Sequence, residues 1–196
     1  MQANSGPDKP LSLFRHRVVW ICAAFYVSYQ SVEATFTGWI VVFMLRARNA
    51  TPTVAGLASS TFWIGMTVGR YTLSLITERY GVSRAVGTYI SLALCFQVIL
   101  NTVTQVNTTI LLLAANGFFV APLFPSGIVL LVSRLQNHLH MSAVALLIAV
   151  GQIGGALATL AVGFMADSLG IRHLFEVLCG LSALMLVLWV VFAQTG

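Results

Sequence analysis

The sequence predicts an all-α, polytopic membrane protein with six transmembrane helices. Apolar residues make up 58% of the 196 residues and charged residues only 8%, against about 25% charged residues in soluble domains. So few charges do not solvate the surface of a globule of this size, and the mean hydropathy of +0.91 agrees with this reading. The apolar residues also fall into six runs, each close to the roughly 20 residues that cross a bilayer as a helix.

Short polar breaks separate the six runs. The predicted spans are residues 18–45, 53–77, 85–103, 110–132, 141–165 and 174–193. Lipid offers the backbone no hydrogen-bond partners, and the runs are too long and too continuously apolar for barrel strands, so each span is expected to be helical. Pro122 and Pro125 should break or bend the fourth span.

The two ends of the chain lie outside the predicted membrane domain. Residues 1–17 are polar and are followed by an apolar run too long for a signal peptide. We interpret 1–17 as a cytoplasmic tail or the remnant of a linker, and 194–196 as a short C-terminal tail.

The basic residues predict the orientation. Six of them lie on the N-terminal side of the membrane and three on the other side, which places both termini in the cytoplasm. The first group is Lys9, Arg15, Arg17, Arg79, Arg84 and Arg134, and the second is Arg46, Arg48 and Arg172. Two glycosylation sequons, at Asn49 and Asn107, fall on the predicted outer side. The alternative is that both sequons occur by chance.

The ends of the second and fifth spans resemble each other. The two segments read Ser74-x-x-x-Glu78-Arg79-x-Gly81-x-x-Arg84 and Gly163-x-x-x-Asp167-Ser168-x-Gly170-x-Arg172. In the predicted topology the two copies lie on opposite sides of the membrane. Two inverted three-helix repeats would place them there.

Glu33 lies near the middle of the first span and is the main candidate for function. A carboxylate at that depth costs at least about 2.5–3.5 kcal/mol unless it faces water, a partner or a proton. At about 100° per residue, Tyr26, Tyr29, Gln30 and Thr37 share its stripe of the helix. We interpret this stripe as the lining of a polar cavity, in which Glu33 contacts a proton or a solute hydroxyl. The alternative is a Glu33 that only pairs with another helix.

Other intramembrane polar residues extend the candidate binding site. Arg70 would bind an oxygen-rich solute or pair with a carboxylate, or else reach the cytoplasmic headgroups. Asn116 and Gln152 would hydrogen-bond a solute or join two helices. With Gln30, and with Trp39 as a ring for stacking, they are typical of a carbohydrate site.

No pattern in the sequence indicates catalysis, a cofactor or a metal. The three cysteines lie far apart without zinc-site spacing, and His138 and His140 form an isolated pair in a loop. The net charge of +5 comes mostly from arginines near span ends, so we do not expect nucleic-acid binding. The expected partners are the lipid bilayer, a small-molecule solute and protons.

Several short motifs carry a family resemblance. Glu78, Arg79, Gly81 and Arg84 fit a loop of the form G-x-x-x-D-[RK]-x-G-[RK]-[RK], with Ser74 in place of the first glycine, Glu in place of Asp, and Val82-Ser83 interrupting the basic pair. That loop joins the second and third helices in each half of Major Facilitator Superfamily transporters, and the chain resembles the C-terminal six-helix half of one. Four further segments resemble the fungal fucose-permease-like branch of sugar–proton symporters. They are residues 38–41, 65–70, 121–125 and 151–156.

The resemblance implies alternating-access transport of a small polar solute such as a sugar, coupled to protons, with the loop of Glu78 and Arg79 latching the cytoplasmic gate. The family has twelve helices in two halves, so the resemblance also implies a second half, from another copy or another polypeptide. An alternative of a different class is a truncated or regulatory membrane protein without transport activity of its own. We do not expect an enzyme.

Overall fold

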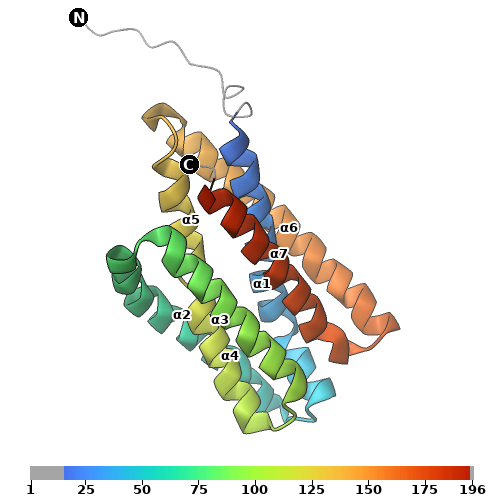
Figure 1. Cartoon of the computed structure of the whole chain (residues 1–196). Helices are drawn as coiled ribbons and strands as arrows, with labels where there is room; N and C mark the ends of the chain where they lie inside the picture. The colour runs from blue at the N-terminus through green and yellow to red at the C-terminus, as the bar shows by residue number, and fades with distance from the viewer. Residues whose placement is uncertain (1–15, 195–196) are drawn as a thin grey trace, which may run out of the picture.

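The computed structural model describes residues 16–194, and within that range all regular structure is helical. The helices are α1 (Arg17–Ala47), α2 (Pro52–Tyr80), α3 (Val82–Thr102), α4 (Val106–Val120), α5 (Leu123–Val132), α6 (His140–Ser168) and α7 (Leu174–Gln194), with short 3-10 turns η2 (Asn137–Leu139) and η3 (Ile171–His173). Helices α4 and α5 form one span interrupted at Ala121 and Pro122, so six spans are present, as the fold class predicts (Figure 1). Most of the predicted N-terminal tail lies outside the described residues.

The six spans differ in how apolar they are. Four helical segments are long and apolar enough to cross a membrane: Val82–Thr102, Val106–Val132, Asn137–Ser168 and Ile171–Gln194. Helices α1 and α2 are as long but are not among the four, because polar side chains interrupt their apolar runs. In a membrane protein, such helices are expected to face protein or a water-filled cavity rather than lipid.

Helix α1 lies at the centre of the bundle. It packs against α6, α7 and α2, while α2 packs along α4, and α3 lies against α7 and α4 (Figure 1). Phe36 of α1 stacks on Phe62 of α2, and both Phe36 and Phe43 contact the ring of Phe175 in α7. These ring contacts fix three helices around the polar middle of α1.

Helices α2 and α4 approach each other at backbone distance. A Cβ atom on Gly65 would lie 2.0 Å from the carbonyl oxygen of Ala114, and one on Gly69 would lie 2.1 Å from that of Phe118. On the α4 side, a Cβ on Gly117 would lie 2.3 Å from a carbonyl oxygen of α2. The spacing of Gly65 and Gly69 is that of a small-xxx-small helix-packing motif, and only glycine fits these positions.

Two arginines that the sequence suggests only as orientation signals cap helix ends. Arg48 donates to the Leu100 carbonyl at 3.0 Å and to the Val103 carbonyl, which terminate α3. Arg134 donates to carbonyls of the last turn of α7 and lies over the ring of Phe192. Burial lowers the pKa of Arg48, but a guanidinium stays charged in proteins. Both arginines therefore satisfy carbonyls that a helix end leaves without a donor.

The sequence resemblance between the ends of the second and fifth predicted spans extends to the backbone conformation. Gly81, after α2, has φ 85° and ψ 137°, and Gly170, after α6, has φ 95° and ψ 150°. These angles favour glycine, because a Cβ atom is strained there. The two predicted repeats thus turn through the same conformation at the same place in their motifs.

Candidate transport site

Glu33 lies near the middle of α1 and is half-buried. One turn earlier, the hydroxyl of Tyr29 is buried, and the Glu33 carboxylate is a polar group close enough to interact with it. Glu33 and Arg70 are the charged side chains that act electrostatically on this hydroxyl. The structure therefore brings three of the predicted site residues, from α1 and α2, into one region.

Arg70 keeps its guanidinium free to act on a ligand. Its side chain is exposed, and among the described residues it donates a hydrogen bond to the Met66 sulfur, at 3.8 Å. No salt bridge joins it to Glu33 in the described part of the chain. The neighbouring Gly69 is locked against α4, so the position of Arg70 on α2 is fixed by backbone packing.

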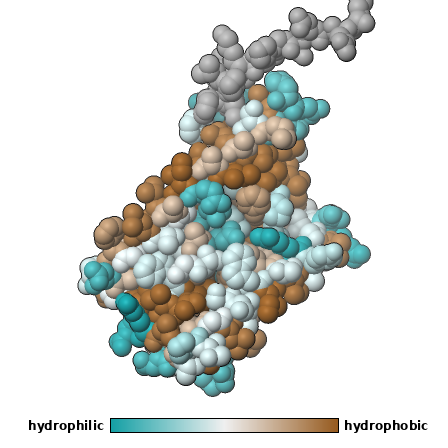
Figure 2. Space-filling model, turned by 180° about the vertical axis from the view of Figure 1, so that it is seen from behind, coloured by the Kyte–Doolittle hydropathy of each residue, from teal (hydrophilic) through white to brown (hydrophobic). Residues whose placement is uncertain are grey.

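Gln30 and Gln152 also retain exposed polar groups. Gln30 is half-buried beside α6, where a Cβ on Gly155 would lie 2.9 Å from its Cγ atom, and Gln152 is exposed on α6. The seam between these helices is closed by Ser31, whose hydroxyl donates to the Gly154 carbonyl at 3.2 Å. Figure 2 shows hydrophilic surface lying between hydrophobic areas on the rear face of the molecule. Polar side chains near a helix seam can thus remain reachable from outside the bundle.

Tyr26 and Asn116 do not lie on an open face. The hydroxyl of Tyr26 donates to the Phe124 carbonyl, and the ring is 1% exposed. Asn116 is fully buried and donates from Nδ2 to the Ala93 carbonyl at 2.9 Å. In this structure these two side chains join α1 to α5 and α4 to α3, and neither is accessible to a solute.

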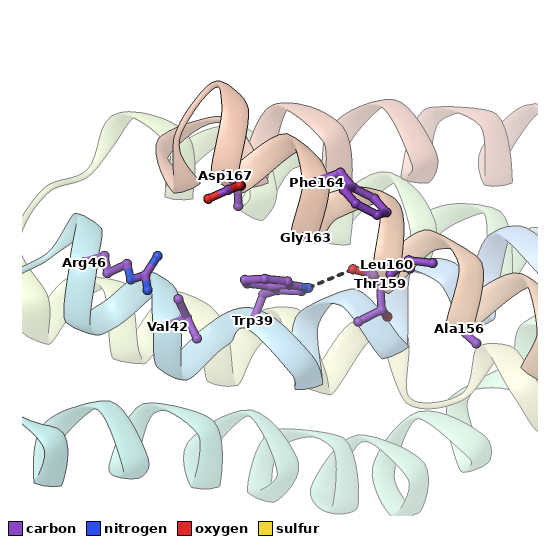
Figure 3. A pocket seen from close by; sticks show the side chains of 10 residues that line it. Trp39, Val42, Arg46, Ala156, Thr159, Leu160, Gly163, Phe164 and Asp167 are labelled. Carbon is purple, nitrogen blue, oxygen red and sulfur yellow. Dashed lines mark hydrogen bonds between the residues drawn. The ribbon is translucent and has the colours of Figure 1, made fainter.

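Trp39 belongs to a different place from Glu33. It comes six residues later, which is roughly 9 Å along the axis and about 120° around the helix. Its Nε1 atom donates to the Thr159 carbonyl at 3.2 Å, and a Cβ on Gly163 would touch its ring at 3.2 Å. It lines a cavity of about 800 Å³ between α1 and α6 (Figure 3). The predicted site is therefore divided between two regions of α1, and spacing alone did not separate them.

The predicted gating loop lies open at the α2–α3 turn. Glu78, Arg79 and Arg84 are all exposed. Among the described residues the one salt bridge is between His173 and Glu176, at 2.9 Å, so the loop forms no latch within this chain.

The two sequons lie in neighbouring loops. Asn49 follows α1 and Asn107 lies in the first turn of α4, and both are exposed. The loops are adjacent because Arg48 reaches the Val103 carbonyl. Both sequons are thus at the same end of the bundle, opposite the predicted gating loop.

A bundle of six long helices, with ionisable side chains in the middle of the two least apolar ones, defines a polytopic integral membrane protein. The chain belongs to the Major Facilitator Superfamily, which matches residues 11–195. The family assignment explains the fold and the paired glycine turns, and it agrees with the resemblance seen in the sequence.

Curated relatives are similar along much of this chain. Bypass of stop codon protein 6 of Saccharomyces cerevisiae is 26% identical over 99% of this chain and 41% of its own length. The glucose/mannose transporter GlcP of Bacillus subtilis is 24% identical over 69% of this chain and 33% of its own. A glucose/galactose transporter of Brucella abortus is 28% identical over 83% of this chain and 39% of its own. The chain thus spans less than half the length of these relatives.

A solved structure shares the fold. The fucose:proton symporter FucP of E. coli superposes with a TM-score of 0.84 at 16% identity, over 99% of this chain and 48% of FucP. A second FucP structure, in the outward conformation, gives a TM-score of 0.82 at 17% identity. The similarity establishes the architecture of one half of such a protein.

Proposed function

We propose that this chain forms one half of a secondary active transporter that moves a small polar solute, such as a hexose, together with protons. The observation that carries the proposal is the grouping of Glu33, Tyr29 and Arg70 in the middle of the bundle. Placing a carboxylate inside the membrane costs several kcal/mol of free energy, and such residues typically mark a solute or proton pathway. Relatives named as glucose transporters and a fold shared with a fucose:proton symporter support the solute class and the coupling.

The charges suggest how coupling works. An ionised Glu33 attracts the Arg70 guanidinium, whereas a protonated Glu33 is neutral and leaves Arg70 to donate to solute oxygens. Gln30 and Gln152 add neutral hydrogen-bonding groups beside the same helices. Protonation and solute binding would therefore favour each other, as symport requires.

The proposal includes a second half. Family members bind solute between two six-helix halves, and the face of α2 carries large exposed side chains such as Ile64 and Tyr71. We propose that a second copy of the chain or another polypeptide covers Glu33 and Arg70. In that assembly the loop of Glu78 and Arg79 would latch the cytoplasmic gate in one of the two states. Both termini would then be cytoplasmic, and Asn49 and Asn107 would be glycosylation sites on the outer side.

Uptake into proteoliposomes tests the function. Chain purified and reconstituted in lipid is expected to accumulate labelled glucose when the outside is made acidic. Glu33→Gln should abolish the response to the pH gradient, and Arg70→Gln should weaken glucose uptake. Glu176→Gln is the matched control, because Glu176 is exposed at the start of α7 and pairs with His173. Uptake driven equally well in Glu33→Gln would overturn the role of Glu33.

The runner-up function is a regulatory or truncated membrane protein without transport of its own. It is favoured by the exposure of Arg70, which is costly in lipid when nothing covers it. Light scattering of the purified chain separates the two proposals. A dimer that takes up solute supports the transporter, and a strict monomer without uptake supports the runner-up.

A further inference from the structure

We infer that the wedge between the outer ends of α1 and α6 is a second binding site for a neutral, hydroxyl-rich solute such as a hexose. The wedge is lined by Trp39, Arg46, Thr159, Gly163, Phe164 and Asp167, among others, and encloses about 800 Å³. That volume lies in the range of roughly 300–1,000 Å³ that is usual for small-molecule pockets. The inference rests on the proposed solute class but concerns a place separate from Glu33.

The Trp39 ring is held as a fixed platform. Its Nε1–H bond to the Thr159 carbonyl and its contact with Gly163 tie one edge of the indole to α6. Figure 3 shows the ring between the two helices, with cavity residues around it. An indole face carries negative potential, which attracts the C–H groups of a sugar ring. A fixed ring loses little freedom when a ligand stacks on it.

Two opposite charges stand beside this platform. Arg46, near the end of α1, and Asp167, near the end of α6, point toward the same space in Figure 3. Both are exposed, and neither forms a salt bridge within residues 16–194. A carboxylate accepts and a guanidinium donates in planar, two-pronged geometry, which suits neighbouring hydroxyl groups. The wedge therefore offers both a hydrogen-bond donor and an acceptor that form no salt bridge with another of residues 16–194.

The balance of charge selects the ligand class. Arg46 and Asp167 cancel, so a phosphorylated or carboxylated sugar would meet one repulsive charge for each attractive one. A neutral polyol with an apolar ring face can stack on Trp39 and hydrogen-bond to both Arg46 and Asp167. A zwitterion also satisfies both charges, and one with a quaternary ammonium group gains a cation–π contact with Trp39, so it is the competing ligand that the test must separate.

The position of the wedge suggests its use. It opens at the end of the bundle that carries Asn49, roughly two helical turns from Glu33. A hexose held on Trp39 would be concentrated near the outer entrance before it reaches the site in the middle of the membrane. Binding at the wedge should therefore persist when transport through Glu33 is disabled.

Saturation-transfer NMR on the purified full-length chain, with D-glucose as the probe, tests this assignment. In an Arg70→Gln background, which removes the proposed solute contact in the middle of the bundle, Trp39→Ala and Asp167→Asn should each weaken the saturable glucose signal roughly tenfold, the effect of losing a stacking or charge-assisted contact. Trp39→Phe should weaken it less, because the smaller ring still stacks. Trp63→Ala is the matched control, because Trp63 is an exposed tryptophan of α2 outside the cavity. Thermal unfolding of each variant shows whether it is folded, and Asp167→Asn alters only an exposed side chain.

Glu33→Gln separates this inference from the proposed function. If glucose binds in the wedge, the Glu33→Gln variant should keep the Trp39-dependent glucose signal even when proton-driven uptake is lost. Complete loss of the signal in Glu33→Gln, with no change in Trp39→Ala, would overturn the wedge and leave the transport proposal intact. Stronger saturation of glycine or glycerophosphocholine than of glucose would also overturn it, by assigning the wedge to a zwitterion or a lipid headgroup. Absence of any saturable glucose signal would also overturn the assignment of the wedge as a glucose site, whatever the uptake assay shows.

Discussion

A methyl group added at Gly69 has no room between α2 and α4. The new Cβ atom would lie 2.1 Å from the Phe118 carbonyl oxygen, and ordinary contact begins near 3.4 Å, so the helices must open by 1.3 Å. The obstacle is backbone, which cannot turn aside as a flexible side chain can. Gly65 and Gly117 lie on the same seam, so the opening also separates their contacts.

The expected cost follows from that opening. Overpacking of a well-packed interface costs about 1–3 kcal/mol, and a gap of 0.5–1 Å forfeits roughly a quarter to a half of each dispersion contact it separates. Alanine regains about 0.5–1 kcal/mol through its higher helix propensity. We therefore expect Gly69→Ala to lower the free energy of unfolding by about 1–2 kcal/mol. For a chain of this length, that corresponds to a fall in Tm of roughly 2–8 °C.

Thermal unfolding in detergent, followed with a fluorogenic maleimide in a Cys95→Ser, Cys179→Ser background, measures this effect, because the remaining Cys22 is buried and reacts when the bundle opens. Gly56→Ala is the control, since it lies on the same helix with nothing within 4 Å of the added Cβ atom. It should leave Tm unchanged or raise it by a few degrees through about 0.5–1 kcal/mol of helix propensity. Equal Tm values for Gly69→Ala and Gly56→Ala would refute the close approach of α2 and α4.

Three further substitutions test other parts of the structure, each by the same thermal assay. Arg134→Gln should lower the free energy of unfolding by about 1.5–3 kcal/mol, because the carbonyls at the end of α7 lose a charged donor. The control Arg17→Gln, at an exposed position of α1, should leave Tm unchanged. Equal Tm values for the two variants would show that Arg134 does not cap α7. Gly81→Ala should cost about 1–3 kcal/mol through backbone strain at positive φ, although no atom crowds the position; an unchanged Tm would contradict the turn. Asn116→Ala should cost about 1–2 kcal/mol by removing its bond to Ala93 and should leave glucose affinity unchanged, whereas a tenfold loss of affinity would place Asn116 at the solute.

The helical architecture was predictable because lipid restricts the choices of the chain. Six apolar runs could only be helices, and Pro122 marked the interruption between α4 and α5. The resemblance between the segments ending in Gly81 and Gly170 corresponds to two turns with nearly the same φ and ψ. These features depend on local sequence and on the solvent, so they need no knowledge of which helices touch.

The site was less predictable because it depends on how helices cross. Counting 100° per residue grouped Tyr26 with Glu33, but α5 packs over Tyr26 and takes its hydroxyl. The same counting cannot show that residues of α1 and α6 around Trp39 line a cavity. The resemblance between the ends of the second and fifth spans pointed to Asp167, but its position near Arg46 in one cavity is visible only in the three-dimensional arrangement.

The burial of α1 explains how the chain tolerates an acid in the membrane. Helices α2, α6 and α7 surround α1, so a span too polar for lipid is screened on most of its circumference. Glu33 nevertheless remains half-buried, and Arg70 on α2 is exposed. Exposure of both charges to hydrocarbon would cost several kcal/mol, whereas a water-filled space beside α1 and α2 would solvate them. The arrangement thus favours a hydrated cavity over lipid on this face, and such a cavity is what a transporter needs for a polar solute.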